Sequence, residues 1–205
     1  MRQLVAIGAS TGGTVALESI LSRLPLDIAP VLIVQHTLPG FTGALVRRLD
    51  MVCPMRVVEA VHGHTIQSGV AYIAPGDSHL FVERQDPQGR ELRTMLTRTP
   101  PVHFHRPSID VLFHSLVTLP GVEVIAVLLT GMGQDGVEGM VALRGAGAHT
   151  IAQDEASSVI FGMPKKAIER GAAQHISSLD QLPDRILSCL GQETRSGPSV
   201  RLEAV

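Results

Sequence analysis

The chain has no tryptophan, a single tyrosine and only 3% aromatic residues in 205 positions, and neither sign of charge dominates, because the formal net charge is −2. Proteins that bind single-stranded nucleic acid stack the bases on aromatic rings, and those that bind duplexes present a basic face. This sequence offers neither feature. We therefore expect no nucleic-acid partner.

Long hydrophobic runs and cysteines are also scarce. No apolar stretch reaches the ~18 residues of a membrane helix. The N-terminal Met1-Arg2-Gln3 leads directly into an apolar segment and lacks the pattern of a secretory signal peptide. The two cysteines, Cys53 and Cys189, fit reduced core thiols in apolar helical surroundings. These features predict a cytoplasmic protein without direct membrane insertion.

Hydrophobic residues make up 44% of the 205-residue chain, which is enough for one domain with its own core. They recur in two patterns that alternate along the sequence. Uninterrupted apolar runs predict buried strands, and i, i+3, i+4, i+7 spacing predicts helices between them. We expect an α/β fold with a doubly wound, mostly parallel sheet, helices on both faces and an antiparallel hairpin at one side.

The expected strands span 4–9, 29–35, 55–61, 71–74, 122–129 and 150–152. The expected hairpin strands span 80–85 and 91–97, around Asp86-Pro87-Gln88-Gly89. The expected helices span 41–51 and 164–170, with apolar faces also at Leu17, Ile20, Leu21 and Leu24, at 109–117, at 137–141 and at 182–190.

A serine stands between glycines where the first expected strand meets a helix. Gly8-Ala9-Ser10-Thr11-Gly12 fits the G-x-S-x-G elbow that presents a nucleophile at the carboxyl end of a strand. Free N–H groups and the positive end of a helix dipole converge at such a turn. Two alternatives remain from these residues alone. The turn could hold a nucleotide phosphate, or Ser10 could simply cap the helix.

Two more chemistry-bearing residues follow neighbouring strands. His36 follows the second expected strand, and Asp135 follows the glycine-rich loop after the strand at 122–129. Ligands bind at the carboxyl edge of open parallel sheets, so Ser10, His36 and Asp135 form a candidate nucleophile, base and orienting acid. Asp77 and Asp154 are rival acids, ranked lower because Asp135 follows the strongest candidate for a central strand.

The same chemistry requires donors for a developing oxyanion. The backbone N–H groups at the helix start, near Thr11 and Gly12, and those of the loop containing Met132 and Gly133 are the candidates.

Histidine pairs and the glycine-rich turn raise cofactor alternatives. His62-Gly63-His64 and His103-Phe104-His105 have no third ligand at a recognisable spacing, so we expect exposed loop histidines and no metal. A dinucleotide site would place an acidic residue after the second strand, where Gln35-His36 stands instead. We therefore expect no cofactor.

At these residues the sequence resembles the catalytic domain of the chemotaxis protein-glutamate methylesterases, the CheB family. The matching segments occur in order along nearly the whole chain. They are Gly8-Ala9-Ser10-Thr11-Gly12-Gly13, Gln35-His36, Phe41-Thr42, Ala74-Pro75-Gly76, His79-Leu80, His105-Arg106-Pro107-Ser108, Thr130-Gly131-Met132-Gly133-Gln134-Asp135-Gly136 and 154–164. The resemblance implies a doubly wound α/β hydrolase that removes methyl esters from chemoreceptor glutamates with release of methanol. Some members also deamidate receptor glutamines.

The resemblance implies the same roles for the site residues: Ser10 as nucleophile, His36 as base and Asp135 as acid. It places Thr11 and Met132 in the lining of the site, with Arg106 and the 157–163 loop near the same cleft. The implied partners are methylated cytoplasmic helices of a chemoreceptor.

The expected domain organisation is a catalytic domain over 1–191 and a polar, loose tail over 192–205. Family members commonly carry an N-terminal receiver domain, and we expect none here, so this chain is either an excised domain or a stand-alone esterase. A separate regulatory domain or protein is an expected partner. His103-Phe104 departs from the more polar residues expected before Arg106, which would alter substrate contacts. Two alternatives to the receptor esterase are an esterase with a non-chemoreceptor substrate and a non-catalytic receptor-docking module.

Overall fold

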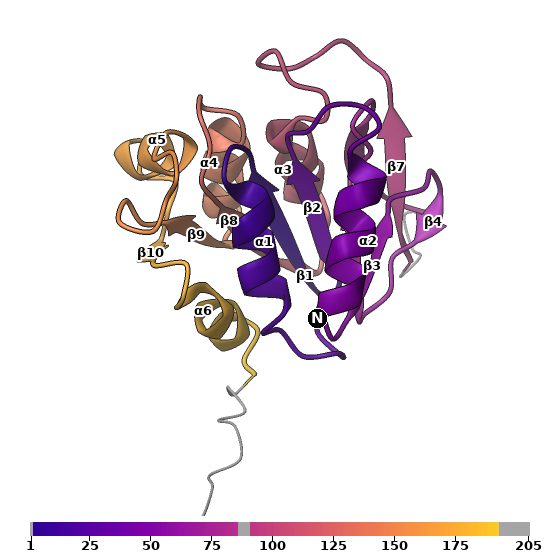
Figure 1. Ribbon diagram of the computed structural model, residues 1–205, viewed down its shortest axis with the longest axis horizontal. Helices are drawn as coiled ribbons and strands as arrows, with labels where there is room; N and C mark the ends of the chain where they lie inside the picture. The colour runs from indigo at the N-terminus through magenta and orange to yellow at the C-terminus, as the bar shows by residue number, and fades with distance from the viewer. Residues whose placement is uncertain (1, 86–90, 193–205) are drawn as a thin grey trace, which may run out of the picture.

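The computed structural model describes residues 2–85 and 91–192, arranged as a sheet between two layers of helices (Figure 1). The strands are β1 (Arg2–Ala9), β2 (Val31–Gln35), β3 (Arg56–Glu59), β4 (His64–Thr65), β5 (Val70–Ile73), β6 (His79–Arg84), β7 (Leu92–Thr97), β8 (Val122–Leu128), β9 (His149–Gln153) and β10 (His175–Ser177). The helices are α1 (Gly13–Leu21), α2 (Thr42–Val52), α3 (Ile109–Val117), α4 (Val137–Gly145), α5 (Met163–Glu169) and α6 (Leu182–Cys189).

The main sheet is parallel throughout and has the strand order β10-β9-β8-β1-β2-β5-β3. Strand β1 lies at its centre, where Val5 is in register with Val31 on one side and with Ile125 on the other. Residues 4–9 are buried because helices cover both faces of the sheet, which explains the unbroken apolar run. The predicted fold class is confirmed.

Helices α1, α2 and α6 cover one face of the sheet, and α3, α4 and α5 cover the other (Figure 1). Alternate strand residues face the two layers: Ile7 and Ile33 belong to the first core, and Ala6 and Leu32 to the second. The longest described helix, α2, has 11 residues, and no described helix is long and apolar enough to cross a bilayer.

The predicted hairpin forms a small sheet of its own. Strands β6 and β7 pair antiparallel as expected, and β4 adds to them in the order β4-β7-β6. This sheet contacts α3, where the Ser115 hydroxyl accepts a hydrogen bond from Val82 N at 3.1 Å. The predicted turn Asp86-Pro87-Gln88-Gly89 lies outside the described residues, as does the predicted tail beyond residue 192.

Several local predictions need correction. Strands β4 and β10 were not predicted, and β3 is shorter than the expected 55–61 segment. Leu24 is buried but lies beyond the end of α1. Cys53 and Cys189 are free and pack against the core, as predicted, but both are half-buried rather than fully enclosed. Each stands at the C-terminal end of a helix, at the margin of the core.

Gly13, the first residue of α1, provides a test of the packing between this helix and the sheet. A Cβ at Gly13 would lie 2.1 Å from Gln35 Oε1 and 2.7 Å from Ala9 Cβ. We expect Gly13→Ala to lower the free energy of unfolding by about 2–3 kcal/mol, because the backbone of Ala9 cannot move without disturbing β1. Urea denaturation followed by circular dichroism measures this change.

Gly145→Ala is the matched control, since a Cβ at this last residue of α4 meets no atom within 4 Å. It should leave the free energy of unfolding unchanged or raise it by up to about 1 kcal/mol. Equal destabilisation by the two substitutions would contradict the steric argument.

Candidate functional site

Ser10 and His36 follow adjacent strands at the carboxyl edge of the sheet. The last residues of β1 and β2, Ala9 and Gln35, are in register, and His36 N donates to Ala9 O at 2.9 Å. The Gln35 side-chain amide donates to the carbonyl oxygens of both Ser10 and His36, each at 2.9 Å. A single buried amide therefore holds the two turns together.

The turn at Ser10 is enclosed by the loop that follows β8. Ser10 N donates to Thr130 O at 3.0 Å, and a Cβ at Gly131 would lie 2.5 Å from Ser10 Cβ. Only a glycine permits the loop to approach the serine so closely. The alternative that Ser10 caps α1 is wrong, because the N-cap is Gly12 and no side chain caps this helix.

His36 and Asp135 form a buried pair. His36 Nε2 lies 2.7 Å from Asp135 Oδ2, and the two side chains are 7% and 0% exposed. An ionised carboxylate only accepts hydrogen bonds, so neutral His36 carries its proton on Nε2. Its other nitrogen, Nδ1, is buried and has no hydrogen-bond partner among the described residues. This lone pair is available to a proton donor in the site.

The carboxylate of Asp135 is held at the N-terminus of α3. Oδ1 accepts from the Ser108 hydroxyl at 2.7 Å and from Asp110 N at 3.2 Å, and Oδ2 accepts from Ile109 N at 2.7 Å. Burial alone raises the pKa of Asp135, but the hydrogen bonds from His36, Ile109 N and Ser108 together bring the pKa below its usual value. Asp135 therefore stays ionised beside His36.

His79 supports this arrangement from behind. It is fully buried, its Nδ1 accepts from Ser108 N at 3.1 Å, and its Nε2 lies 3.2 Å from Pro100 O. Because a backbone N–H can only donate, His79 is neutral with its proton on Nε2. Burial is the main cause that lowers the pKa of His79. His79 thus positions Ser108, which positions Asp135.

His105 packs on the ring of His36, with ring centroids 3.7 Å apart and an interplanar angle of 16°. The prediction that His105 is merely an exposed loop histidine is wrong, since it is half-buried against the site. Burial, followed by the proximity of His36, lowers the pKa of His105, so a neutral ring stacks on the candidate base. No spacing in the sequence signals this contact, because it depends on the fold of the loop between β7 and α3.

The rival acids are engaged elsewhere. Asp77 Oδ2 accepts from Arg98 at 2.6 Å, and Asp154 Oδ1 accepts from the Ser157 hydroxyl at 2.5 Å and from Ser157 N at 3.0 Å. Neither carboxylate is hydrogen-bonded to His36, so the geometry favours Asp135 as the partner of this histidine.

The predicted oxyanion donors lie around Ser10. In residues 2–85 and 91–192, the N–H groups of Thr11, Gly12, Met132 and Gly133 donate no hydrogen bond. Thr11 and the Met132 side chain are exposed, and Thr11 O accepts from the Thr130 hydroxyl at 2.9 Å, which ties the two loops together.

Within the same described residues, Ser10 and His36 share no side-chain hydrogen bond. Such contacts are often long in ligand-free enzymes and tighten with substrate.

Two further segments predicted near the cleft do lie there. The loop containing Ile160 joins the glycine-rich loop through Gly131 N, which donates to Ile160 O at 3.0 Å. Arg106 belongs to a pocket of about 260 Å³ beside His36. The other lining residues of this pocket are Thr37, Leu38, Pro39, Gly76, Asp77, Pro101, Phe104, His105 and Pro107.

The remaining loop histidines make no metal cluster with one another in the described structure. His62 Nδ1 accepts from Leu96 N at 3.2 Å, and His103 Nε2 lies 3.2 Å from Asp110 Oδ2. His62, His64 and His103 are exposed, as expected.

Comparison with known proteins identifies close relatives. A family model described as CheB methylesterase matches residues 5–186. A solved structure described as the Thermotoga maritima CheB methylesterase catalytic domain superimposes with a TM-score of 0.87 at 36% sequence identity. The match covers 92% of this chain and 98% of that one.

Three curated relatives carry the name protein-glutamate methylesterase/protein-glutamine glutaminase. The chain is 48% identical over 200 residues to the one from Methylobacillus flagellatus, 47% over 193 residues to that from Ralstonia nicotianae and 44% over 200 residues to that from Salmonella typhimurium. These matches cover 98%, 94% and 98% of the chain, but 55%, 50% and 55% of the relatives. The chain thus spans about half their length.

The buried, neutral state of His79 predicts a pH-dependent stability. Because the pKa of His79 is lower in the folded chain, the unfolded chain binds a proton first as the pH falls below about 6.5. The stability that neutral His79 contributes is complete above that pH and is lost below it. When the pH falls from about 7.5 to about 5.5, we expect the free energy of unfolding to drop less in His79→Gln than in the wild type. The slopes of this free energy against pH should differ by at most about 1.4 kcal/mol per pH unit.

Urea denaturation at both pH values measures the slopes. His62→Gln is the control, because His62 is exposed and should keep the wild-type slope. The argument fails if the His79 variant and the wild type lose the same free energy of unfolding on acidification.

Proposed function

Since the chain belongs to the CheB methylesterase family, we propose that it hydrolyses methyl esters of protein glutamate side chains, with Ser10 as nucleophile, His36 as general base and Asp135 as the acid that orients His36. The observation that carries this proposal is the 2.7 Å contact between His36 Nε2 and Asp135 Oδ2, which leaves a buried, unused Nδ1 lone pair on a residue whose backbone N–H is hydrogen-bonded to Ala9, the neighbour of Ser10.

In the first half-reaction, Ser10 Oγ attacks the carbonyl carbon of the γ-methyl ester, and His36 Nδ1 takes the hydroxyl proton. The tetrahedral intermediate places its negative charge on the former carbonyl oxygen, where the unengaged N–H groups of Thr11, Gly12 and Met132 are the candidate donors. Protonated His36 then gives the proton to the departing methoxide, which leaves as methanol. An acyl-enzyme on Ser10 remains.

In the second half-reaction, water attacks the acyl-enzyme while His36 Nδ1 takes its proton. The intermediate collapses with return of that proton to Ser10 Oγ, and the glutamate carboxylate is released. Asp135 stabilises the imidazolium in both halves, because its own pKa is lowered and it stays charged. Deamidation of a glutamine follows the same steps with ammonia in place of methanol, in keeping with the second half of the relatives' names.

Exposed apolar side chains around the site favour a protein substrate. Phe104 is fully exposed, and Met132, Leu38 and Val159 are exposed by 75%, 70% and 65%. All four belong to loops at the carboxyl edge of the sheet. Large exposed apolar residues around a site are typical of protein recognition. The proposed substrate is a methylated cytoplasmic helix of a chemoreceptor; a separate regulatory domain or protein stays a prediction.

The loop carrying Phe104 is built as a strained turn. Val102 and His105 exchange backbone hydrogen bonds of 3.0 and 2.8 Å, and the two residues between them, His103 and Phe104, have φ values of 48° and 65°. Two-residue turns of this form ordinarily use asparagine and glycine, because larger residues are strained at positive φ. The two backbone hydrogen bonds close the turn despite this strain, and Phe104 lies in solvent at the rim of the pocket that contains His36. We assign Phe104 a substrate-contacting role.

Removing the nucleophile tests the reaction. Ser10→Ala should abolish methanol release from methylated receptor membranes, and Asp135→Asn should lower the rate by about 10⁴-fold, because an asparagine favours the wrong tautomer of His36. Asp77→Asn is the matched control; its carboxylate is bound by Arg98 rather than by His36, so its rate should stay within about tenfold of the wild type.

A fluorophosphonate probe separates this proposal from the docking-module alternative. Labelling of the wild type on Ser10 supports the esterase. An unlabelled wild type, or methanol release that survives Ser10→Ala, would overturn the assignment. Release from methylated proteins other than receptors would redirect the proposal to another substrate.

Phe104→Ala tests the substrate contact. We expect KM for the methylated receptor to rise about tenfold with kcat unchanged, since the side chain contributes to binding alone. Hydrolysis of a small chromogenic ester should not change. Ile176→Ala, which removes an exposed apolar side chain from β10, is the control. Equal effects of the two substitutions on receptor KM would refute a specific role for Phe104.

A further inference from the structure

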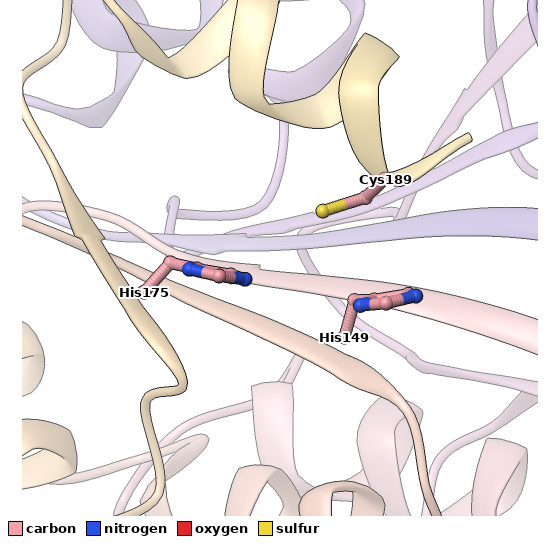
Figure 2. Close-up of side chains that lie close together, drawn as sticks. All are labelled: His149, His175 and Cys189. Carbon is pink, nitrogen blue, oxygen red and sulfur yellow. The ribbon is translucent and has the colours of Figure 1, made fainter. Parts of the chain in front are cut away.

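Three metal-ligating side chains meet at the amino-terminal edge of the sheet, opposite the edge that carries Ser10. His149 is the first residue of β9, His175 is the first of β10, and Cys189 is the last of α6. Figure 2 shows the two imidazole rings side by side on neighbouring strands, with the thiol on the helix that covers them. One ligand atom from each of the three lies within 4.8 Å of the other two.

We propose that His149, His175 and Cys189 bind one Zn²⁺ ion, which fastens α6 to the edge of the sheet. Two imidazole nitrogens and a thiolate form a donor set that Zn²⁺ accepts in tetrahedral sites, with the fourth position open to solvent. Tetrahedral bonds of about 2.0–2.3 Å place ligand atoms about 3.3–3.8 Å apart, so ligand atoms that lie within 4.8 Å of one another need to close by roughly 1 Å at most. All three side chains are half-buried and border an open hollow of about 410 Å³.

The strongest sign of a missing ligand is on His149. Its Nδ1 is buried and has no hydrogen-bond partner in the described structure, which costs free energy unless something binds there. The opposite nitrogen, Nε2, lies 3.6 Å from Glu123 Oε1, and Glu123 Oε2 accepts from the Gln3 side chain at 2.9 Å. A carboxylate behind the far nitrogen of a histidine is the usual support of a metal ligand.

The strand register explains why the rings share a face. His175 is in register with Ile151, and His149 precedes Ile151 by two residues, so both histidines point to the same side of the sheet. This is the side on which Ile151, Ile186 and Cys189 belong to one core cluster or pack against it. The exposed Arg185 also borders the hollow and is the cation that a bound Zn²⁺ would repel.

Zinc titration of the whole 205-residue chain, stripped with a chelator beforehand, tests the site. We expect one Zn²⁺ per chain, and an affinity more than about 100-fold lower in Cys189→Ser and in His175→Asn. Glu123→Gln should weaken binding by about tenfold, and Arg185→Ala should strengthen it. The matched controls, Cys53→Ser and His62→Asn, remove the same residue types elsewhere and should bind as the wild type does.

Two further measurements identify the ligands and the role. With Co²⁺ in place of Zn²⁺, a thiolate charge-transfer band should appear in the wild type and in Cys53→Ser but not in Cys189→Ser. Zinc should also raise Tm and slow amide exchange in α6 of the wild type, and do neither in Cys189→Ser. Circular dichroism tests whether each variant is folded. If Cys189→Ser does not fold, His175→Asn takes its place as the ligand variant. Unchanged affinity in both ligand variants, or zinc binding without protection of α6, would overturn the proposal.

Discussion

The site depends on one hydrogen bond, between His36 Nε2 and Asp135 Oδ2, and this bond brings together distant parts of the chain. His36 is placed by the register of β2 on β1, whereas Asp135 is placed by the loop after β8. A charged carboxylate buried so deeply is tolerated only because other donors share it. The N-terminus of α3 supplies those donors, so the helix that covers the sheet also keeps the acid ionised.

Because the site depends on this hydrogen bond, the polar residues that hold Asp135 in place also matter for the proposed reaction. Ser108 both begins α3 and donates to Asp135, and it is itself held by the buried ring of His79. The segment that precedes Ser108 also contributes His105, whose ring stacks on His36, the hydrogen-bond partner of Asp135. The segment between β7 and α3 therefore fixes both members of the pair, while its tip presents Phe104 to solvent. One loop therefore combines the residues that position the His36–Asp135 pair with the residue that we propose contacts the substrate.

The sequence predicted the parts whose signal is local. Unbroken apolar runs marked β1, β2 and β8, and their ends pointed to Ser10, His36 and the loop of Asp135, because parallel strands all end at one edge. What the sequence could not indicate arises from contacts between distant segments. Strands β4 and β10 have two and three residues, too few for a periodic pattern. His79 and His105 acquire their partners only when the irregular loop folds over the site.

The cluster at the other edge was missed for a related physical reason. His149, His175 and Cys189 are spaced 26 and 14 residues apart, far from any spacing that places ligands on one turn or loop. They meet because β9 and β10 are parallel neighbours and α6 crosses their amino ends. In an open parallel sheet, ligands bind at the carboxyl edge, so the loops there must stay open to substrate. The amino edge binds no substrate, and its side chains can serve stability instead. The proposed ion would therefore stabilise α6 without touching Ser10, His36 or Asp135, the residues that we propose carry out the reaction.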